Sequence, residues 1–256
     1  GRGGAGGRGR RSDRRRVVRG DREGTRDAWG GRRGRMAMEL RGERASSSLR
    51  GAPLRGLRTI HRLRVFRAKR EQLRARGRAG EALEQLQYSV PAQTLGMDPQ
   101  ELQALVQEWM HERPLKHLRA LALPDLKPFL LGAREAGAKL GVFSDYAPGA
   151  KLDALDVRDL VDLELAATDP EINAFKPHPA GFVRACEEWG LPAREVLCVG
   201  DREGLDGAGA RAAGMGVCIL GPGAMRAATP APDALVDWVL PDLGSLARKL
   251  GWRVDA

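Results

Sequence analysis

Cysteine is scarce in this sequence, which excludes a fold held together by disulfides. The chain contains three cysteines, Cys186, Cys198 and Cys218, and each stands among apolar neighbours. Cysteines of this kind act as small core residues, and three of them do not form a disulfide framework. Since reduced thiols suit a reducing compartment, we predict a cytoplasmic location.

Long apolar runs are lacking as well. No stretch approaches the roughly 20 apolar residues of a membrane-spanning helix. No apolar segment follows the basic N-terminal stretch, so a secretory signal is not expected. Aromatic residues make up only 5% of the chain. The 42% of hydrophobic residues therefore predict a sizeable, mainly aliphatic core, with no membrane partner.

Acidic residues are few only in the first third of the chain. Residues 1–80 carry 26 Lys/Arg and 7 Asp/Glu, whereas residues 81–256 carry 17 and 26. The net charge of +10 thus comes from the N-terminal part. The Gly/Arg repeats of residues 1–16 have almost nothing to bury, which predicts a disordered arm. Nucleic acid is not an expected partner of the protein, because this arm alone could bind it.

Residues 57–122 have the apolar spacing of helices. One helix start is marked clearly, because Asp98 stands at an N-cap, Pro99 at N1 and Glu101 at N3 of a capping box. The apolar residues that follow recur at intervals of three and four, as on one face of a helix. We therefore expect an all-helical unit here.

After Pro124 the pattern changes to short apolar runs that alternate with helices. Such an alternation is typical of a parallel sheet covered on both faces. The sequence therefore predicts an α/β fold with a doubly wound parallel sheet, whose chemistry lies at the carboxyl ends of the strands. The expected strands are 140–143, 163–165, 196–199, 217–220 and 236–240, and the expected helices are about 126–136, 149–156, 178–189, 205–214 and 241–250.

Hydroxyl and carboxylate side chains follow two of these strands. Ser144 and Asp145 come after the first, where a serine hydroxyl and nearby N–H groups can hold a phosphate oxygen. A serine of a turn or N-cap is the alternative. Asp201 and Asp206 follow the third strand and suit Mg²⁺, unless they belong to a solvated loop. Gly200 allows close approach of the backbone to a ligand.

Lys176 lies between these two strand ends. Its neighbours Phe175 and Pro177 restrict the backbone, so its ammonium is held more firmly than that of an ordinary surface lysine. A fixed point charge suits a phosphate group. A solvent-exposed lysine in a Pro-rich loop is the alternative, and His178 is expected to start a helix.

The order of these features resembles the haloacid dehalogenase (HAD) superfamily of hydrolases. Ser144 matches its second motif, Lys176 its third, and Asp201 with Asp206 its fourth. The resemblance implies a Rossmann-like core of residues 17–35 and 123–256 with a helical cap of residues 36–122. It also implies a Mg²⁺-dependent phosphohydrolase of a small phosphorylated metabolite, with phosphate held by Ser144, Asp145 and Lys176.

The first motif of this superfamily is Asp-x-Asp-Gly-Thr, and residues 21–25 come nearest to it. The resemblance makes Asp21 the nucleophile, which forms an aspartyl-phosphate, and Glu23 the acid and base. It assigns Asp21, Glu23, Asp201 and Asp206 to Mg²⁺. Three features depart from the pattern. Glu23 is one methylene too long, and the arginines before Asp21 do not suit a buried strand. Arg26 also stands where the family has an apolar residue.

These departures leave a second interpretation open, a catalytically impaired relative with a binding or regulatory role. The chain has then lost its first motif, or its start does not represent the functional protein. A third hypothesis gives the Gly/Arg arm a role in binding RNA. On the first cap helix, His61, Arg64, Arg67 and Lys69 are expected to form mainly a solvated face, although some could meet an anionic substrate.

Overall fold

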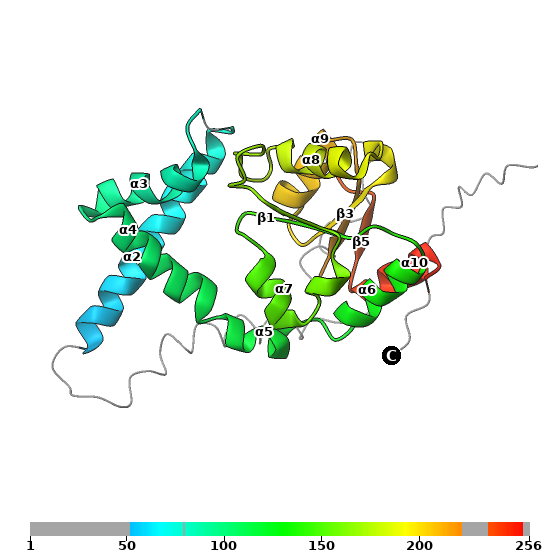
Figure 1. Cartoon of the computed structure of the whole chain (residues 1–256), viewed down its shortest axis with the longest axis horizontal. Helices are drawn as coiled ribbons and strands as arrows, with labels where there is room; N and C mark the ends of the chain where they lie inside the picture. Colours follow the sequence, from blue (N-terminus) through cyan, green and yellow to red (C-terminus); the bar gives the residue numbers. More distant parts are fainter. Residues whose placement is uncertain (1–51, 79, 222–234, 253–256) are drawn as a thin grey trace, which may run out of the picture.

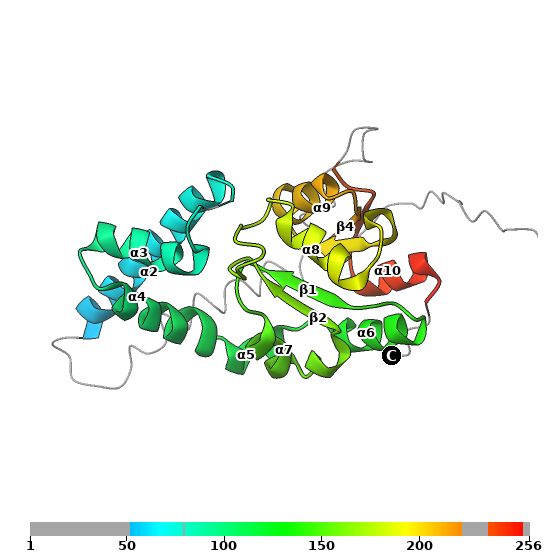
Figure 2. The ribbon, with the colours of Figure 1, turned by 45° about the horizontal axis from the view of Figure 1, so that its top comes forward.

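The computed structural model describes residues 52–78, 80–221 and 235–252. The predicted arm of residues 1–16, the candidate residues Asp21 and Glu23, and the start of the predicted cap lie outside the described residues. The boundaries proposed for core and cap therefore stay predictions. Two groups of elements are described, one helical and one α/β (Figures 1 and 2).

The helical group, which we call the cap, packs around an aromatic and aliphatic core. Phe66 and Tyr88 stack with ring centroids 5.7 Å apart, and Leu102 and Val106 are fully buried beside them. Asp98 caps its helix as predicted, because its Oδ1 accepts from the N–H groups of Gln100 and Glu101. The elements are α2 (Ala52–Ala75), α3 (Leu83–Leu95), α4 (Pro99–Val106), η2 (Gln107–Glu112) and α5 (Leu115–Leu121).

The α/β group follows the predicted alternation of helices and strands. Its boundaries agree with the sequence pattern to within about two residues, apart from the segment after β3, which divides into two short helices. Two further short turns, η3 (Arg158–Leu160) and η4 (Ala193–Glu195), link elements. The strands are β1 (Gly141–Ser144), β2 (Leu163–Ala166), β3 (Leu197–Gly200), β4 (Gly216–Leu220) and β5 (Trp238–Leu240); the helices are α6 (Leu126–Glu135), α7 (Gly149–Leu155), α8 (Ala180–Trp189), η5 (Glu203–Gly207), α9 (Ala208–Ala212) and α10 (Leu243–Leu250).

Alternate side chains of β4 show why helices cover both faces of the sheet. Val217 and Ile219 pack with Phe182 of α8, whereas Cys218 packs with Phe129 of α6 and with α10. Figures 1 and 2 show α8 and α9 on one side of the strands and α6 and α10 on the other. The strand is apolar throughout because neither face meets water.

All described strand pairs are parallel, yet they divide into two sheets. Strand β1 pairs with β2, and β4 pairs with both β3 and β5. Between β1 and β3 lies a cleft of about 130 Å³, whose lining includes Val142, Phe143, Cys198 and Val199. Val199 is 40% exposed, although it is an apolar residue on a strand. We call this opening the inter-sheet cleft.

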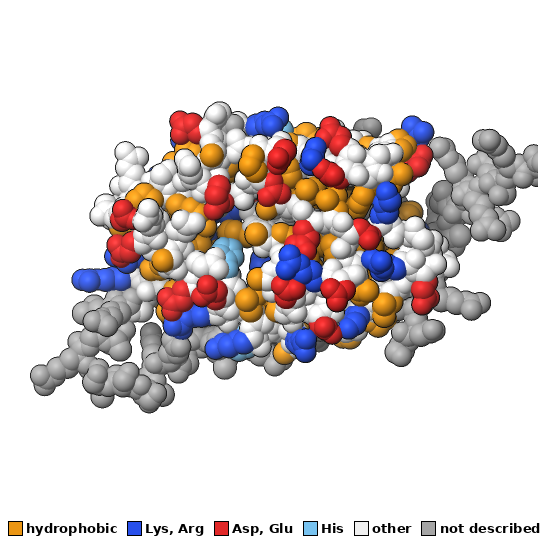
Figure 3. Space-filling model, viewed as in Figure 1, with side chains coloured by type: hydrophobic (Ala, Val, Ile, Leu, Met, Phe, Trp, Pro, Cys, Tyr) orange, Lys and Arg blue, Asp and Glu red, His pale blue; other side chains and the backbone are white. Residues whose placement is uncertain are grey.

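The cap rests on the carboxyl ends of the strands. Leu73 of α2 and Leu83 of α3 are buried against Ala167 and Phe175, which follow β2. None of the helices in the described ranges is long and apolar enough to cross a membrane. Acidic and basic side chains are interspersed over the face of the molecule in Figure 3, so no patch of one sign dominates it.

Candidate functional site

A buried ion pair joins the two sheets at their carboxyl ends. The Lys176 ammonium lies 2.6 Å from Oδ1 of Asp206 and donates to the carbonyl of Phe143 at 3.3 Å. The side chains of Lys176 and Asp206 are only 16% and 10% exposed. Phe143 belongs to β1 and Asp206 follows β3, so the two strands end at the same place. The structure thus brings Lys176 and Asp206, two of the candidate site residues, together.

Asp206 is buried because Gly200 leaves room for it. A Cβ atom on Gly200 would lie 2.4 Å from the Cβ of Asp206, which no side chain tolerates. The other carboxylate oxygen of Asp206, Oδ2, accepts from the N–H of Arg202 at 3.2 Å. The glycine was expected to admit a ligand, and the structure shows that it admits the Asp206 side chain.

Ser144 and Asp145 stand at the end of β1 beside this pair. The Ser144 hydroxyl oxygen accepts from the N–H of Tyr146 at 3.3 Å, which is the turn geometry left open as an alternative. Asp145 accepts from the Lys176 N–H at 3.3 Å and from Arg74 Nη2 at 2.8 Å. Its carboxylate is therefore neutralised by the cap, which lessens its repulsion of a phosphate group nearby.

The described residues do not form a metal site by themselves. Asp201 is exposed at the start of the turn, and both oxygens of Asp206 already accept from donors. In the part of the chain that the structure describes, no three carboxylate, histidine or cysteine side chains gather as ligands. Asp206 is an oxygen donor of the kind that Mg²⁺ prefers, but further carboxylates are needed.

Two arginines of α2 reach the site, and sequence reasoning missed both. Arg70 is 4% exposed, and its Nη2 donates to the Asp145 carbonyl at 3.1 Å. Arg74 donates to the carboxylate of Asp145 and to the Lys176 carbonyl. Burial lowers the pKa of Arg74, but hydrogen bonds to Asp145 and Glu71 outweigh it and raise the pKa overall. These contacts fasten the cap to the carboxyl ends of the strands.

The helical spacing of α2 contains a signal for Arg70. It lies four residues after Phe66 and three before Leu73, both of which are buried, so it shares their face of the helix. The residues expected to be solvated behave differently. His61, Arg64 and Arg67 are exposed and Lys69 is half-buried, which confirms the solvated face.

Tyr146 lies at the centre of a second group of side chains, between cap and core. The Arg70 guanidinium carbon is 3.9 Å from its ring centroid, and the His111 ring meets it edge-on at 4.7 Å. The Lys151 ammonium is 5.4 Å from the same centroid. Burial, with Lys151 and Arg70 nearby, lowers the pKa of His111 to about 4, so this imidazole is neutral at pH 7.

Burial also governs the remaining groups around Tyr146. It raises the pKa of the Tyr146 hydroxyl and, together with the charge of Arg70, lowers the pKa of Lys151. Tyr146 and Lys151 line a cleft of about 500 Å³ between the cap and the loop after β1. We call it the cap cleft, and it adjoins Asp145.

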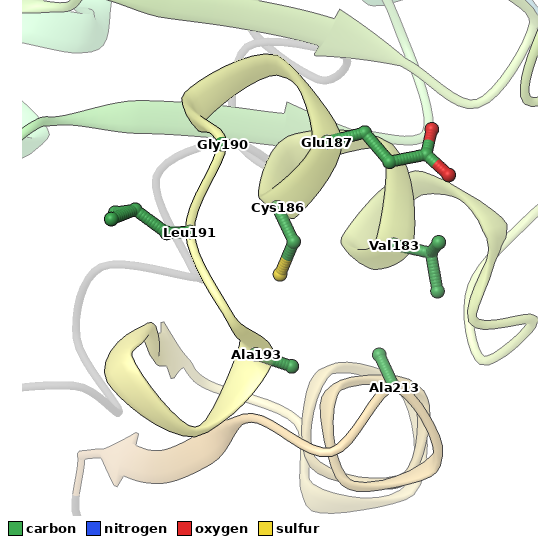
Figure 4. Close-up of a pocket in the computed structure, with 7 residues that line it drawn as sticks. All are labelled: Val183, Cys186, Glu187, Gly190, Leu191, Ala193 and Ala213. Atoms are coloured by element: carbon green, nitrogen blue, oxygen red, sulfur yellow. The ribbon is translucent and has the colours of Figure 1, made fainter.

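A further hollow lies away from both clefts, between α8 and the segments near η4 and α9 (Figure 4). Cys186, Ala193 and Ala213 line it, and the carboxylate of Glu187 points away from it. Its lining contains no cation, so it offers nothing to hold a phosphate. The chemistry of the described residues is therefore at the carboxyl ends of the strands.

A helical cap over the carboxyl ends of parallel strands, with a lysine and an aspartate paired there, defines a capped α/β protein with a Rossmann-like core. The family model of haloacid dehalogenase-like hydrolases matches residues 39–214. This range covers more than half of the chain, and the chain belongs to that family. The match begins after Asp21 and Glu23, so it does not bear on them.

Among curated proteins, two archaeal glyceraldehyde 3-phosphate phosphatases are similar to this chain. The protein of Pyrococcus abyssi is 32% identical over 108 residues, which are 41% of this chain and 44% of the relative. That of Methanopyrus kandleri is 32% identical over 125 residues, or 47% and 52% of the two chains. The chain thus spans about half the length of the curated relatives it matches.

Solved structures of dehalogenases share the fold. The 2-haloacid dehalogenase of Pseudomonas syringae is 22% identical, with 84% of this chain and 89% of the other covered and a TM-score of 0.52. The L-2-haloacid dehalogenase of Xanthobacter autotrophicus is 24% identical, with 78% and 88% covered and a TM-score of 0.51. These likenesses confirm the predicted α/β architecture with its helical cap.

Proposed function

We propose that this protein is a phosphatase that hydrolyses the phosphate ester of a small metabolite. The observation that carries the proposal is the buried pair of Lys176 and Asp206 at the carboxyl ends of β1 and β3. A fixed ammonium in a partly dehydrated site stabilises the charge of a phosphoryl group far better than it would in water. Ser144 and its neighbouring N–H groups complete the phosphate site, and the cap limits the substrate to a small molecule.

We propose that the inter-sheet cleft holds the strand that carries the nucleophile. Residues 17–20 have the four-residue length of β1 and β3, and a strand in the cleft would pair with the free edge of each. Asp21 would then follow that strand at the carboxyl end, beside Lys176. Val17 and Val18 suit the apolar lining, whereas Arg19 would need an acidic partner.

The proposed reaction has two steps. The Asp21 carboxylate attacks phosphorus and forms an acyl phosphate; the ester P–O bond breaks, and Glu23 protonates the leaving alcohol. A water molecule, deprotonated by Glu23, then attacks phosphorus and releases inorganic phosphate and the Asp21 carboxylate. Lys176 stabilises the negative charge in both steps.

Mg²⁺ is the cofactor we propose, with Asp206, Asp201, Asp21 and Glu23 as candidate ligands. When bound, the ion shields the negative charges that meet when a carboxylate approaches a phosphate. The described carboxylates alone are too few to hold it, so Mg²⁺ binding depends on the first motif. The three free thiols suit the cytoplasmic location that we also propose.

The test compares two variants of the first motif on a panel of phosphorylated metabolites with Mg²⁺. Asp21→Asn removes the nucleophile and is expected to abolish turnover, whereas Asp27→Asn, a matched change six residues later, is the control. Glu23→Asp restores the family's short carboxylate and is expected to raise kcat, because acid–base transfer is worth roughly 10²–10⁴-fold. An unchanged or lower rate in Glu23→Asp contradicts the assignment of the first motif.

A catalytically impaired relative is the second candidate function. The observation that favours it is the sequence around Asp21, where arginines precede the aspartate and Glu23 stands in place of a shorter carboxylate. In that case the unaltered protein binds inorganic phosphate but turns over no phosphate ester, and Lys176→Met abolishes the binding. Calorimetry of phosphate binding beside the activity screen therefore separates the two functions.

A further inference from the structure

The N-terminal half of helix α2 is strongly basic and does not take part in the site at the strand ends. The helix carries eight Lys/Arg and one acidic residue, Glu71. Only its C-terminal half reaches the site, through Arg70 and Arg74. Figures 1 and 2 show its N-terminal end, in blue, at the end of the cap that lies away from the strands. The basic residues of this half therefore need another explanation.

A row of basic side chains crosses the exposed face of this helix. The row consists of Arg58, His61, Arg64 and Arg67, all of which are exposed. They recur every three residues, which is about 4.5 Å along the helix axis. Within the described residues, the ion pairs of α2 involve only Arg62 and Arg74. The three arginines of the row thus have no carboxylate partner there, and their charge is available to a ligand.

The row begins at a hollow of about 410 Å³ between α2 and the end of α3. The hollow is lined by Leu57, Arg58, His61, Arg62, Thr94 and Leu95. Three of these side chains are basic and none is acidic. Leu57 is 58% exposed, so the hollow presents an apolar surface beside its positive charge. This combination suits a flat base that is flanked by phosphate groups.

We propose that the N-terminal half of α2 binds single-stranded nucleic acid, with phosphates along the row and an unpaired base in the hollow. Arginine binds phosphate through two hydrogen bonds and stacks on bases, which lysine does not, and the row contains arginine and no lysine. The Gly/Arg residues 1–16 precede this helix in the chain, and segments of such composition bind single strands. Nucleic-acid binding, which the sequence confined to that segment, thus extends to the folded cap.

The fold disfavours two other anionic partners. A helix that binds a lipid surface lays its apolar face into the membrane, whereas the apolar face of α2 is buried through Phe66 and Leu73. A nucleic-acid duplex offers phosphates, but its bases are paired and stacked, so none can enter the hollow. A single strand offers both the phosphates and the free base.

The test measures binding of a labelled polyuridine RNA of about 20 nucleotides to the full chain, by fluorescence anisotropy between about 50 and 200 mM salt. The triple variant Arg58→Gln/Arg64→Gln/Arg67→Gln keeps the length of the side chains and removes their charge. We expect it to bind roughly tenfold more weakly. The slope of log Kd against log salt should also decrease by about 2, because each phosphate contact of a single strand contributes about 0.7.

A matched triple variant makes the result specific. Arg119→Gln/Arg194→Gln/Arg248→Gln removes the same charge from exposed positions on α5, η4 and α10. It is expected to retain the affinity and the salt dependence of the unaltered protein. Equal weakening in the two triple variants overturns the inference. An α2 variant that binds like the unaltered protein also overturns it, because residues 1–16 then account for the binding.

A second variant keeps the inference testable if the triple variant does not fold. Arg58→Glu reverses one charge beside the hollow and is expected to weaken RNA binding roughly fivefold, with thermal unfolding as the check on folding. A duplex of the same length is expected to bind more weakly than the single strand. Equal binding of duplex and single strand, or sedimentation of the protein with phosphatidylserine vesicles without any RNA binding, overturns the inference.

Discussion

At the scale of single residues, the site depends on a glycine, which has no Cβ atom. Gly200 ends β3, and the space beside it holds the Asp206 carboxylate, which in turn holds the ammonium of Lys176. Only a residue without a Cβ atom allows this packing. At Gly204, four residues later, an added Cβ atom would have nothing within 4 Å, so the two glycines of one turn have different roles.

This difference leads to a prediction for a matched pair of variants. Gly200→Ala is expected to displace Asp206, to destabilise the fold by about 1–3 kcal/mol because of overpacking, and to weaken phosphate binding. Gly204→Ala is expected to change neither property. Thermal unfolding and phosphate titration measure both, and a Gly200→Ala variant as stable as the unaltered protein contradicts the packing argument.

Sequence reasoning succeeded at this scale where a residue's position in the chain determines its place in the fold. Asp206 was placed from a strand end, because the carboxyl ends of parallel strands share one edge. Arg74 and Tyr146 could not be found in that way, since their roles arise from contacts between cap and core. Whether Asp145 contacts phosphate or only Arg74 is likewise a question of tertiary contacts.

At the scale of elements, helix α2 is the link between cap and core. Its C-terminal half carries Arg70, Leu73 and Arg74, and each contacts residues beyond the strand ends. Its N-terminal half packs within the cap through Leu63 and Phe66. The position of the cap over the site therefore depends on a few side chains within two helical turns.

Removal of one of these side chains tests the link. Arg74→Met breaks the ion pair between Arg74 and Asp145, whose side chains are only 9% and 15% exposed. The variant therefore has a partly buried carboxylate without its cation. We expect a loss of up to about 3 kcal/mol in stability and faster proteolysis at the cap. Arg64→Met, on the exposed face of α2, is the control, and equal proteolysis of the two variants contradicts the assigned link.

The strands and helices themselves were predictable, because burial on both faces makes each strand an apolar run bounded by helices. The helix from Leu83 to Leu95 was not singled out within the helical unit. Its interior Pro91 obscures the pattern, since proline usually ends a helix. Packing of the cap overrides this preference.

At the scale of the whole molecule, the strands of the described residues divide into two sheets, and the strand predicted before Asp21 lies outside the described residues. Alternating apolar runs indicate how many strands there are but not which edges meet. In the described residues, β1 and β3 come together through Lys176 and not through backbone hydrogen bonds. Among the described residues, no strand pairs with the facing edges of β1 and β3, so each is an unpaired strand edge there.

Hydrogen exchange tests whether residues 17–20 occupy this cleft. In the full chain, the amides of β1 and β3 that point into the cleft are expected to exchange slowly. Val18→Pro removes one backbone donor and disturbs strand pairing, so these amides should exchange faster. Met38→Pro, in another apolar part of the N-terminal region, is the control. Fast exchange in the unaltered protein contradicts the proposed strand.

The inter-sheet cleft also bears on whether the nucleophile must belong to the same polypeptide as the rest of the site. If a single short strand brings the nucleophile to an otherwise folded site, the catalytic carboxylate and the rest of the machinery need not belong to one continuous polypeptide. A synthetic peptide with an apolar strand and a terminal aspartate would then act as a second fragment. The protein becomes a two-part enzyme whose turnover reports complementation between fragments.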